Sequence, residues 1–189
     1  MGRTSDAKER IVRSAMELMH AGGYAQAGVQ EICLRAGVRK GSFYHFFASK
    51  SALALAVIAR FRLFSDQFFD RALASDLPPL QRLERLFQMA AALQEETQRE
   101  NGFVKGCPFG NLASEMSGHD EALRLALAAT FTSLQHRLSE LLQEAALPHA
   151  EEKAEALVSL FEGAILLAKT HNDPHLIRRM APIVQQWIR

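Results

Sequence analysis

The sequence lacks a hydrophobic run long enough to cross a membrane. Its longest apolar stretches, residues 52–59 and 164–168, fall far short of the ~20 residues that a membrane-spanning helix needs. The first six residues are mostly polar and do not form a secretory signal peptide. We therefore expect a cytoplasmic protein that does not have a membrane as a partner.

Recognisable catalytic and metal-binding motifs are also missing. The sequence has no glycine-rich phosphate loop, no Gly-x-Ser-x-Gly elbow and no pair of cysteines at metal-binding spacing. His171 and His175 flank Asp173, but Pro174 would break a helix between them, which argues against a metal site there. These absences predict a protein that is not an enzyme and that carries no metal or cofactor.

Strand signals are nearly absent. No segment alternates between apolar and polar residues over the length of a strand, and apolar residues instead recur at three- and four-residue steps, which predicts an all-α fold. Glycine, proline and capping residues divide the chain into about nine expected helices. These are residues 5–21, two short helices on either side of Gly37, then residues 50–75, 80–99, 107–117, 120–146 and 151–170, and a last helix after Pro174.

The formal net charge of +1 is unevenly distributed. Residues 1–50 hold eight basic and four acidic residues, a net charge of +4, whereas the remainder of the chain carries −3. A basic N-terminal part on a mildly acidic body is typical of a DNA-binding domain attached to a domain that binds a small molecule or a protein.

Residues 36–50 combine a turn glycine, several cations, two serines and aromatic residues. Val29, Ile32 and Cys33 lie at helical spacing before the turn at Gly37, so a short helix leads into the turn and a second helix follows at once. This is the arrangement of a helix-turn-helix, in which the second helix enters the major groove of DNA.

The order of these features over residues 11–53 resembles the N-terminal domain of TetR-family transcriptional regulators. The resemblance rests on an amphipathic first helix followed by Gly23-Tyr24, Glu31-Ile32, Ala36-Gly37-Val38, Lys40-Gly41-Ser42-Phe43-Tyr44-His45-Phe46-Phe47 and Ser49-Lys50. One departure is Ala27-Gly28, where the family commonly has Thr or Ser at the start of the second helix. Gly28 has no side-chain acceptor, so we expect a looser helix start and one phosphate-contacting hydroxyl fewer.

The resemblance implies which residues contact DNA. The candidates are the polar residues of the helix-turn-helix and one glycine: Gln30, Arg39, Lys40, Gly41, Ser42, Tyr44, His45 and Lys50. Arg39 is the best candidate for reading a base, because a guanidinium can pair with guanine O6 and N7, which is worth roughly 1–3 kcal/mol of discrimination. Tyr44, His45 and Lys50 are expected on phosphates. Gly41 lets the backbone approach DNA closely. A solvated polar face is the alternative.

A homodimer on a palindromic, double-stranded operator is the expected assembly, because one short recognition helix makes too few base contacts alone. In the resembled family the last two helices form a four-helix bundle in the dimer. Here those helices carry Leu157, Phe161, Ile165, Ile177, Ile183, Val184 and Trp187, although an internal core would give the same pattern. We expect residues 1–50 to be the helix-turn-helix domain and residues 51–189 a helical ligand-binding and dimerisation domain. Repression is the family's commoner behaviour.

Residues 106–112 resemble the Gly-Cys-x-x-Gly-Asn-Leu stretch of a subset of TetR-type regulators. A helix start after Cys107 and the nearby Lys105 both favour a thiolate, so Cys107 could sense oxidants or electrophiles, but packing or pocket lining is the alternative. Cys33 lies on an apolar helix face and is expected in the core. Other residues that could line a site for a small organic effector are Phe64, Phe87, Phe109, Met116, Phe131, Phe161 and Lys169. Lys169 could equally extend to solvent.

Two other functions compete with a ligand-responsive regulator. The first is a helical protein-interaction module that has lost operator binding. The residues that argue against it are Arg39, Lys40, Tyr44 and Lys50. The second is a dedicated redox or electrophile switch through Cys107. If Cys107→Ser responded to oxidants and electrophiles as the unaltered protein does, that switch would be excluded.

Overall fold

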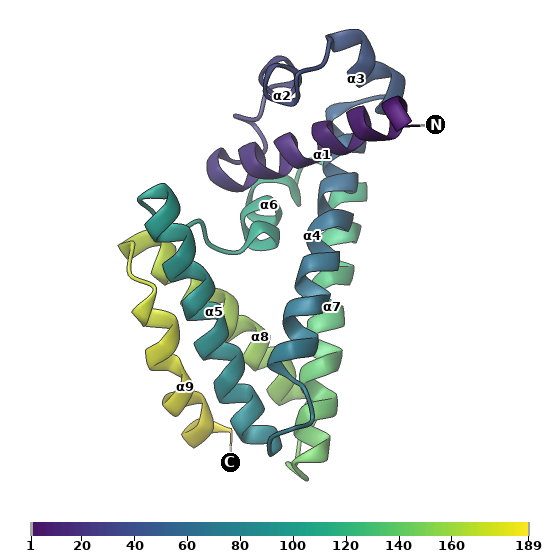
Figure 1. The fold of residues 1–189 in the computed structure, drawn as a ribbon. Helices are drawn as coiled ribbons and strands as arrows, with labels where there is room; N and C mark the ends of the chain where they lie inside the picture. The colour runs from purple at the N-terminus through teal and green to yellow at the C-terminus, as the bar shows by residue number, and fades with distance from the viewer. Residues whose placement is uncertain (1, 189) are drawn as a thin grey trace. The chain divides into compact units, whose positions relative to one another are not determined.

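The computed structural model describes the backbone of residues 2–188 and the side chains of residues 6–188. Figure 1 labels the helices of this part of the chain, which contains no strand, so the predicted all-α fold is confirmed. The helices are α1 Gly2–Gly22, α2 Val29–Ala36, α3 Lys40–Phe46, α4 Lys50–Ala72, α5 Pro79–Asn101, α6 Pro108–Met116, α7 Glu121–Glu144, α8 Ala150–His171 and α9 His175–Trp187. No helix among these is both long and apolar enough to span a membrane.

The helix-turn-helix begins and ends where local signals place it. Gly28 is the extended residue before α2 and makes no side-chain cap, as its lack of a side chain requires. Gly37 adopts the left-handed conformation after α2, with φ of 63°, which glycine tolerates best. Its amide and that of Val38 bond to the last carbonyls of α2, the latter over 3.0 Å to Cys33. This turn sends the chain directly into α3.

Arg85 of α5 binds the backbone where α4 ends. The sequence predicts a helix to residue 75, whereas α4 ends at Ala72. The guanidinium of Arg85 donates to the carbonyl oxygens of Ala72 and Ala74 over 2.8 and 2.7 Å, and it pairs with Asp76. These carbonyls therefore bond to a side chain instead of continuing the helix.

The chain forms two compact units by its internal contacts. One contains the residues up to Phe64 together with Pro108–Ala128, and the other contains Ser65–Cys107 together with the residues from Ala129 onward. In the first unit α1, α2 and α3 contact one another, and α6 lies beside α1 (Figure 1). The predicted functional division at residue 50 stays a prediction.

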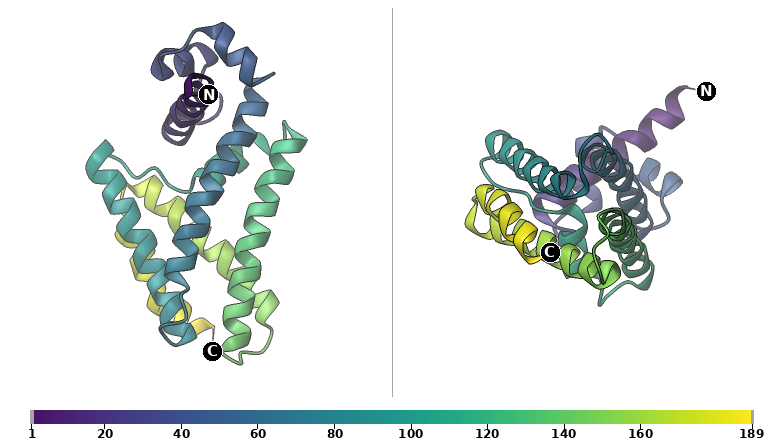
Figure 2. Two further views of the ribbon diagram at one scale, coloured as in Figure 1. Left: turned by 45° about the vertical axis from the view of Figure 1, so that its right-hand side comes forward. Right: turned by 90° about the horizontal axis from the view of Figure 1, so that it is seen from below.

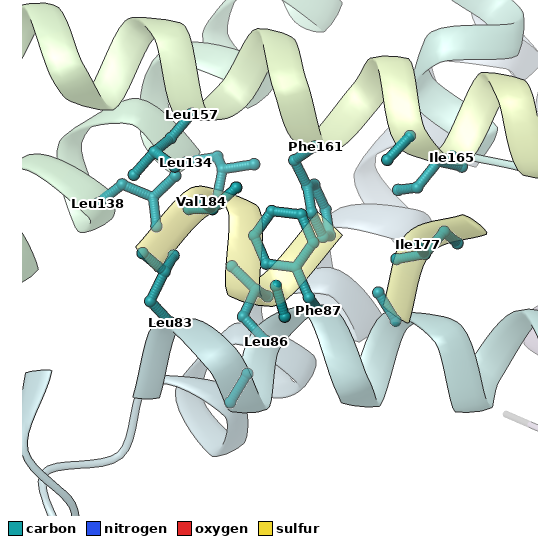
Figure 3. Close-up of a cluster of buried hydrophobic side chains, with 14 of the residues drawn as sticks. Leu83, Leu86, Phe87, Leu134, Leu138, Leu157, Phe161, Ile165, Ile177 and Val184 are labelled. Carbon is teal, nitrogen blue, oxygen red and sulfur yellow. The ribbon is translucent and has the colours of Figure 1, made fainter. Parts of the chain in front are cut away.

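The second unit is built around α5, α8 and α9. Helices α5 and α9 run side by side in both views of Figure 2, and α9 also contacts α8. Their apolar faces meet in the buried cluster of Figure 3, where the Phe87 ring of α5 stands edge-on to the Phe161 ring of α8 with centroids 5.3 Å apart. Leucine and isoleucine side chains from α5, α7, α8 and α9 surround this pair.

A buried arginine closes the loop between α4 and α5. Only 6% of the Arg82 side chain is exposed. Its Nε donates to the carbonyl oxygen of Leu77 over 2.7 Å, one terminal nitrogen reaches the carbonyl oxygen of Leu73 at 3.5 Å, and the other pairs with Glu144 of α7. Arg82 thus holds both ends of this loop and the end of α7 together.

Candidate nucleic-acid interface

Helix α3 presents a polar surface over a buried aromatic anchor. Phe43 is fully buried, which fixes the rotation of the helix about its axis. Arg39, just before the helix, is exposed, and so are Lys40, Tyr44 and His45 of α3 and Gln30 of α2. The helix is short, so these side chains lie within one compact region of the first unit. They are the groups that could meet base edges and phosphates together.

The two exposed rings of α3 rest on aromatic neighbours. Tyr44 is 53% exposed, and its ring stands edge-on to Phe43 with centroids 5.1 Å apart. His45 makes a similar edge contact with Phe46 at 4.9 Å. Because each ring has a fixed partner, its polar end is held in one direction, which reduces the entropy lost when it contacts a phosphate.

Gly41 is not required by the packing of the protein. A Cβ placed on Gly41 would have no atom within 4 Å, so the first unit leaves open space there. Ser42, the next residue, is half-buried, and its amide donates to the carbonyl oxygen of Arg39 over 2.9 Å. A larger residue at position 41 would therefore be tolerated by the fold and felt only by a molecule that approaches α3.

Lys50 lies against the turn between α1 and α2. Its ammonium sits 4.3 Å from the centre of the Tyr24 ring and donates to the carbonyl oxygen of Ala25 over 3.3 Å. Burial lowers the pKa of Lys50, and the carboxylate of Glu115 opposes that shift. Lys50 thus has partners within the protein, whereas the exposed cations Arg39 and Lys40 face solvent.

Two acidic residues at this site were missed by the sequence analysis. The carboxylate of Glu115 accepts the backbone amides of Tyr24 and Ala25, and Asp120 accepts the hydroxyl of Ser51 over 2.5 Å. Both acids lie far along the chain from the helix-turn-helix. No local pattern connects them with it, since a single acidic residue on a helix is usually solvated.

The residues expected to bind an effector are divided between the two units. Phe109 and Met116 are buried in the first unit, where Phe64 is exposed. In the second unit Phe87 and Phe161 pack on each other in the core (Figure 3), and Phe131 and Lys169 are half-buried.

Cys107 has an acidic neighbour. The half-buried thiol of Cys107 donates a hydrogen bond to the carboxylate of Glu162 on α8. Burial raises the pKa of Glu162, and this hydrogen bond opposes the shift. The loop before Cys107 is held by the buried Gln94, whose Oε1 accepts the amide of Gly106 over 3.0 Å. A neighbouring carboxylate disfavours a thiolate, so it works against the helix start and Lys105.

Cys33 differs from Cys107 in its surroundings. It is buried on α2, as predicted, and burial raises the pKa of its thiol, although Lys40 opposes the shift. No three His, Cys, Asp or Glu side chains in the described part of the chain gather in an arrangement that could hold a metal ion.

The residues expected at a dimer interface also fall into two groups. Five of them lie in the core of the second unit: Leu157, Phe161, Ile165, Ile177 and Val184. The other two are exposed on α9, Ile183 to 54% and Trp187 to 48%. On α8, Leu166 and Leu167 are exposed to 61% and 51%. The last two helices therefore keep large apolar side chains on their outer surface as well as in the core.

Comparisons with known proteins cover nearly the whole chain. Residues 79–182 match the family of LmrA/YxaF-like transcriptional regulators over their C-terminal domain, and residues 11–57 match the bacterial regulatory proteins of the tetR family. The transcriptional regulator AcuR of Cereibacter sphaeroides is 36% identical over 176 residues, which cover 89% of this chain and 78% of AcuR. The transcriptional repressor NemR of Escherichia coli is 26% identical over 172 residues, 87% of this chain and 84% of NemR.

Solved structures agree with these matches. The crystal structure of the regulatory protein TetR from Rhodobacter sphaeroides has a TM-score of 0.84 at 33% identity, with 95% of this chain and 97% of that chain covered. The reduced form of E. coli NemR has a TM-score of 0.86 at 25% identity, with 96% of each chain covered.

Proposed function

The chain belongs to the TetR family of bacterial transcriptional regulators, and we propose that it represses transcription from a palindromic operator until a small organic effector or a modification of Cys107 releases it. It is a DNA-binding regulator of transcription, as its relatives are. Repression is supported by NemR, which is named a transcriptional repressor.

The observation that carries DNA reading is the surface of α3. Four exposed polar side chains, Arg39, Lys40, Tyr44 and His45, stand over the buried anchor Phe43. In this proposal Arg39 reads a guanine through its two terminal nitrogens, while Tyr44 and His45 bind phosphates. Lys50 is assigned to a phosphate as well, although its contact with Ala25 leaves it fewer donors than the exposed cations have. Gln30, Ser42 and the open space beside Gly41 complete the surface.

Pairing of two chains through α8 and α9 would place two such surfaces on one duplex. The exposed side chains of Leu166, Leu167, Ile183 and Trp187 supply the apolar area that such an interface needs. The two α3 helices would then read half-sites about 34–36 Å apart, or a multiple of that distance. The core residues of α8 and α9 would support this interface from within the chain.

Cys107 is the proposed point of chemical sensing. Its sequence context resembles the Gly-Cys-x-x-Gly-Asn-Leu stretch of a subset of TetR-type regulators, and NemR has been solved in a form described as reduced. Modification of the sulfur would remove the proton that Glu162 accepts and would add bulk where the thiol is half-buried. A dedicated thiol switch differs from a reversible effector site in needing Cys107 for every response.

Binding to duplex DNA tests the proposal. The unaltered protein would first select its preferred duplex from a random-sequence library, and fluorescence anisotropy would then compare that duplex with a shuffled one at two salt concentrations. We expect Arg39→Ala to weaken binding to the selected duplex about 5- to 150-fold and Tyr44→Ala to weaken it as well. Arg99→Ala removes the same charge from an exposed position of the second unit and is expected to bind as the unaltered protein does.

Two results would count against the proposal. Selection that enriches no sequence would refute operator reading and favour the protein-interaction module. Release of the duplex by N-ethylmaleimide to the same extent in Cys107→Ser and in the unaltered protein would refute sensing through Cys107.

A further inference from the structure

Residues 29–49, which we call the reading segment because they carry the proposed DNA-binding side chains, have their two ends close together in the first unit. Residues 29–49 contain α2 and α3; the turn that precedes them carries Ala25, and Lys50 follows them. The Lys50 ammonium donates to the Ala25 carbonyl oxygen over 3.3 Å and stacks on the Tyr24 ring at 4.3 Å. The reading segment is therefore a loop whose ends are joined at this junction.

A carboxylate from a distant helix lies on the same junction. Glu115 of α6 accepts the Tyr24 amide over 2.7 Å and the Ala25 amide over 2.5 Å. Its Oε2 also lies only 2.7 Å from where a Cβ on Gly23 would be, and Gly23 has φ of +86°. The carboxylate thus sits directly over the turn, with the two amides on one side and the glycine leaving room for it.

Glu115 is itself held in place by its helix. Phe109, Leu112 and Met116 of α6 are buried, and the Phe109 ring contacts the Phe61 ring of α4 with centroids 6.2 Å apart. Just beyond α6, Asp120 accepts the Ser51 hydroxyl near the start of α4. The segment that carries Glu115 is thereby fixed to α4, on which Lys50 also lies.

We propose that Glu115 is a positioning residue for DNA binding. Its carboxylate fixes the Tyr24–Lys50 junction, so that α2 and α3 meet DNA in one orientation. Glu115 acts through the two amides and contacts no DNA. This inference rests on the proposed reading of DNA by α3, because a positioning residue has no effect without a surface to position.

The sign of the effect separates positioning from electrostatics. Removing a negative charge from a DNA-binding unit should strengthen its attraction to phosphates. Loss of positioning should instead weaken binding, because the apparent affinity falls by the fraction of time that the aligned state is populated. A Glu115→Gln variant that binds operator more weakly would therefore contradict the charge effect and support the alignment effect.

The experiment compares Glu115→Gln with Glu121→Gln in the full chain. Glu121 is 82% exposed in the same unit and loses the same charge. On the duplex that the unaltered protein selects from a random library, we expect Glu115→Gln to bind about tenfold more weakly, the result of an aligned junction populated a tenth of the time. On a shuffled duplex its binding should not weaken, and Glu121→Gln should weaken on neither.

Amide hydrogen exchange supplies the measurement that a general loss of stability would not reproduce. Glu115→Gln should speed exchange at the amides of Tyr24 and Ala25 while the thermal midpoint changes little, since glutamine keeps an oxygen for one of the two hydrogen bonds. Glu115→Ala, which keeps neither, should exchange faster and bind the selected duplex more weakly still.

The outcomes separate this inference from the proposed function. Binding of the selected duplex by Glu115→Gln as tight as that by Glu121→Gln would overturn the positioning role alone. If the library yielded no preferred duplex, or if Arg39→Ala bound as tightly as the unaltered protein, the proposed function would be refuted and this inference with it.

Discussion

Replacement of Arg82 by alanine should destabilise the second unit more than removal of its acidic partner does. Arg82 is nearly fully buried and bonds to the carbonyl oxygens of Leu77 and Leu73 as well as to Glu144. In Arg82→Ala the carbonyl oxygens of Leu77 and Leu73 lose a charged hydrogen-bond donor, and Glu144 loses its ion-pair partner. The two variants therefore separate the loop contacts from the ion pair.

The exposure of each partner determines the expected magnitude. Removing one member of a fully buried ion pair costs about 3–5 kcal/mol, because the remaining charge stays unpaired. Glu144 is 53% exposed and regains water, so that cost does not apply to it. The strong bond to Leu77, at 2.7 Å, is the main loss, and a hydrogen bond to a charged group is worth about 1.5–3 kcal/mol. We expect Arg82→Ala to cost about 2–3 kcal/mol. Glu144→Gln should cost less than about 1 kcal/mol, because the buried Arg82 keeps its bonds to the two loop carbonyls and can still bond to the glutamine oxygen.

Urea unfolding monitored by tryptophan fluorescence measures this difference. The protein has one tryptophan, Trp187 on α9, which belongs to the same unit as Arg82. All variants should be compared at one protein concentration, since association changes apparent stability. A loss of unfolding free energy in Arg82→Ala no larger than that in Glu144→Gln would refute the reasoning, because the loop carbonyls would then contribute nothing.

Four further changes test the surface of α8 and α9, the thiol of Cys107 and the carboxylate of Asp120. Trp187→Ala should weaken self-association about 30-fold or more by analytical ultracentrifugation, because a buried tryptophan anchor is worth at least about 2 kcal/mol, and Leu167→Glu should abolish it. Glu162→Gln should speed alkylation of Cys107 at neutral pH, since the carboxylate that disfavours a thiolate is gone. The hydrogen bond from the Ser51 hydroxyl lowers the pKa of Asp120. The Asp120 carboxylate therefore stabilises the fold above its unfolded pKa of 3.8, and this contribution is lost as the pH falls below that value. Asp120→Asn should therefore flatten the acid limb of a plot of stability against pH.

Controls for these tests come from the same chain. Leu125 is exposed to 54% on α7, so Leu125→Ala should leave self-association unchanged. Cys33 is buried with a raised pKa, and it should stay unalkylated while Cys107 reacts. Equal alkylation rates of Cys107 with and without the Glu162 carboxylate would contradict its proposed influence on the thiol. If the stability of Asp120→Asn still falls steeply with decreasing pH, a titratable group other than Asp120 is responsible for that fall.

The helix-turn-helix could be predicted because its signals are local. Gly37 ends α2 in the left-handed conformation that glycine tolerates, and α3 follows three residues later. The buried position of Cys33 also follows from its place on the apolar face of a helix that the sequence itself delimits. The TetR-family membership read from residues 11–53 is confirmed, because the features that carry it are contiguous in the chain.

Contacts between distant residues could not be predicted in this way. The bonds from Glu115 to Tyr24 and Ala25 cross some 90 positions of sequence, and an acidic residue on a helix gives no sign of its partner. Arg82 is buried because backbone carbonyls surround it, whereas its residue type predicts exposure. For α8 the periodicity marks an apolar face, but it cannot say whether Leu157 is covered by the same chain or by a second one.

The division of the first unit between two stretches of sequence has a consequence for its biosynthesis. The last residue of its first stretch is Phe64, and the second stretch ends at Ala128. A ribosome that adds 5–20 residues per second needs roughly 3–13 s to pass from one to the other. For most of that interval the newly made helix-turn-helix is without the carboxylates of Glu115 and Asp120. A graft of residues 1–64 onto another protein would transfer the same unfinished assembly.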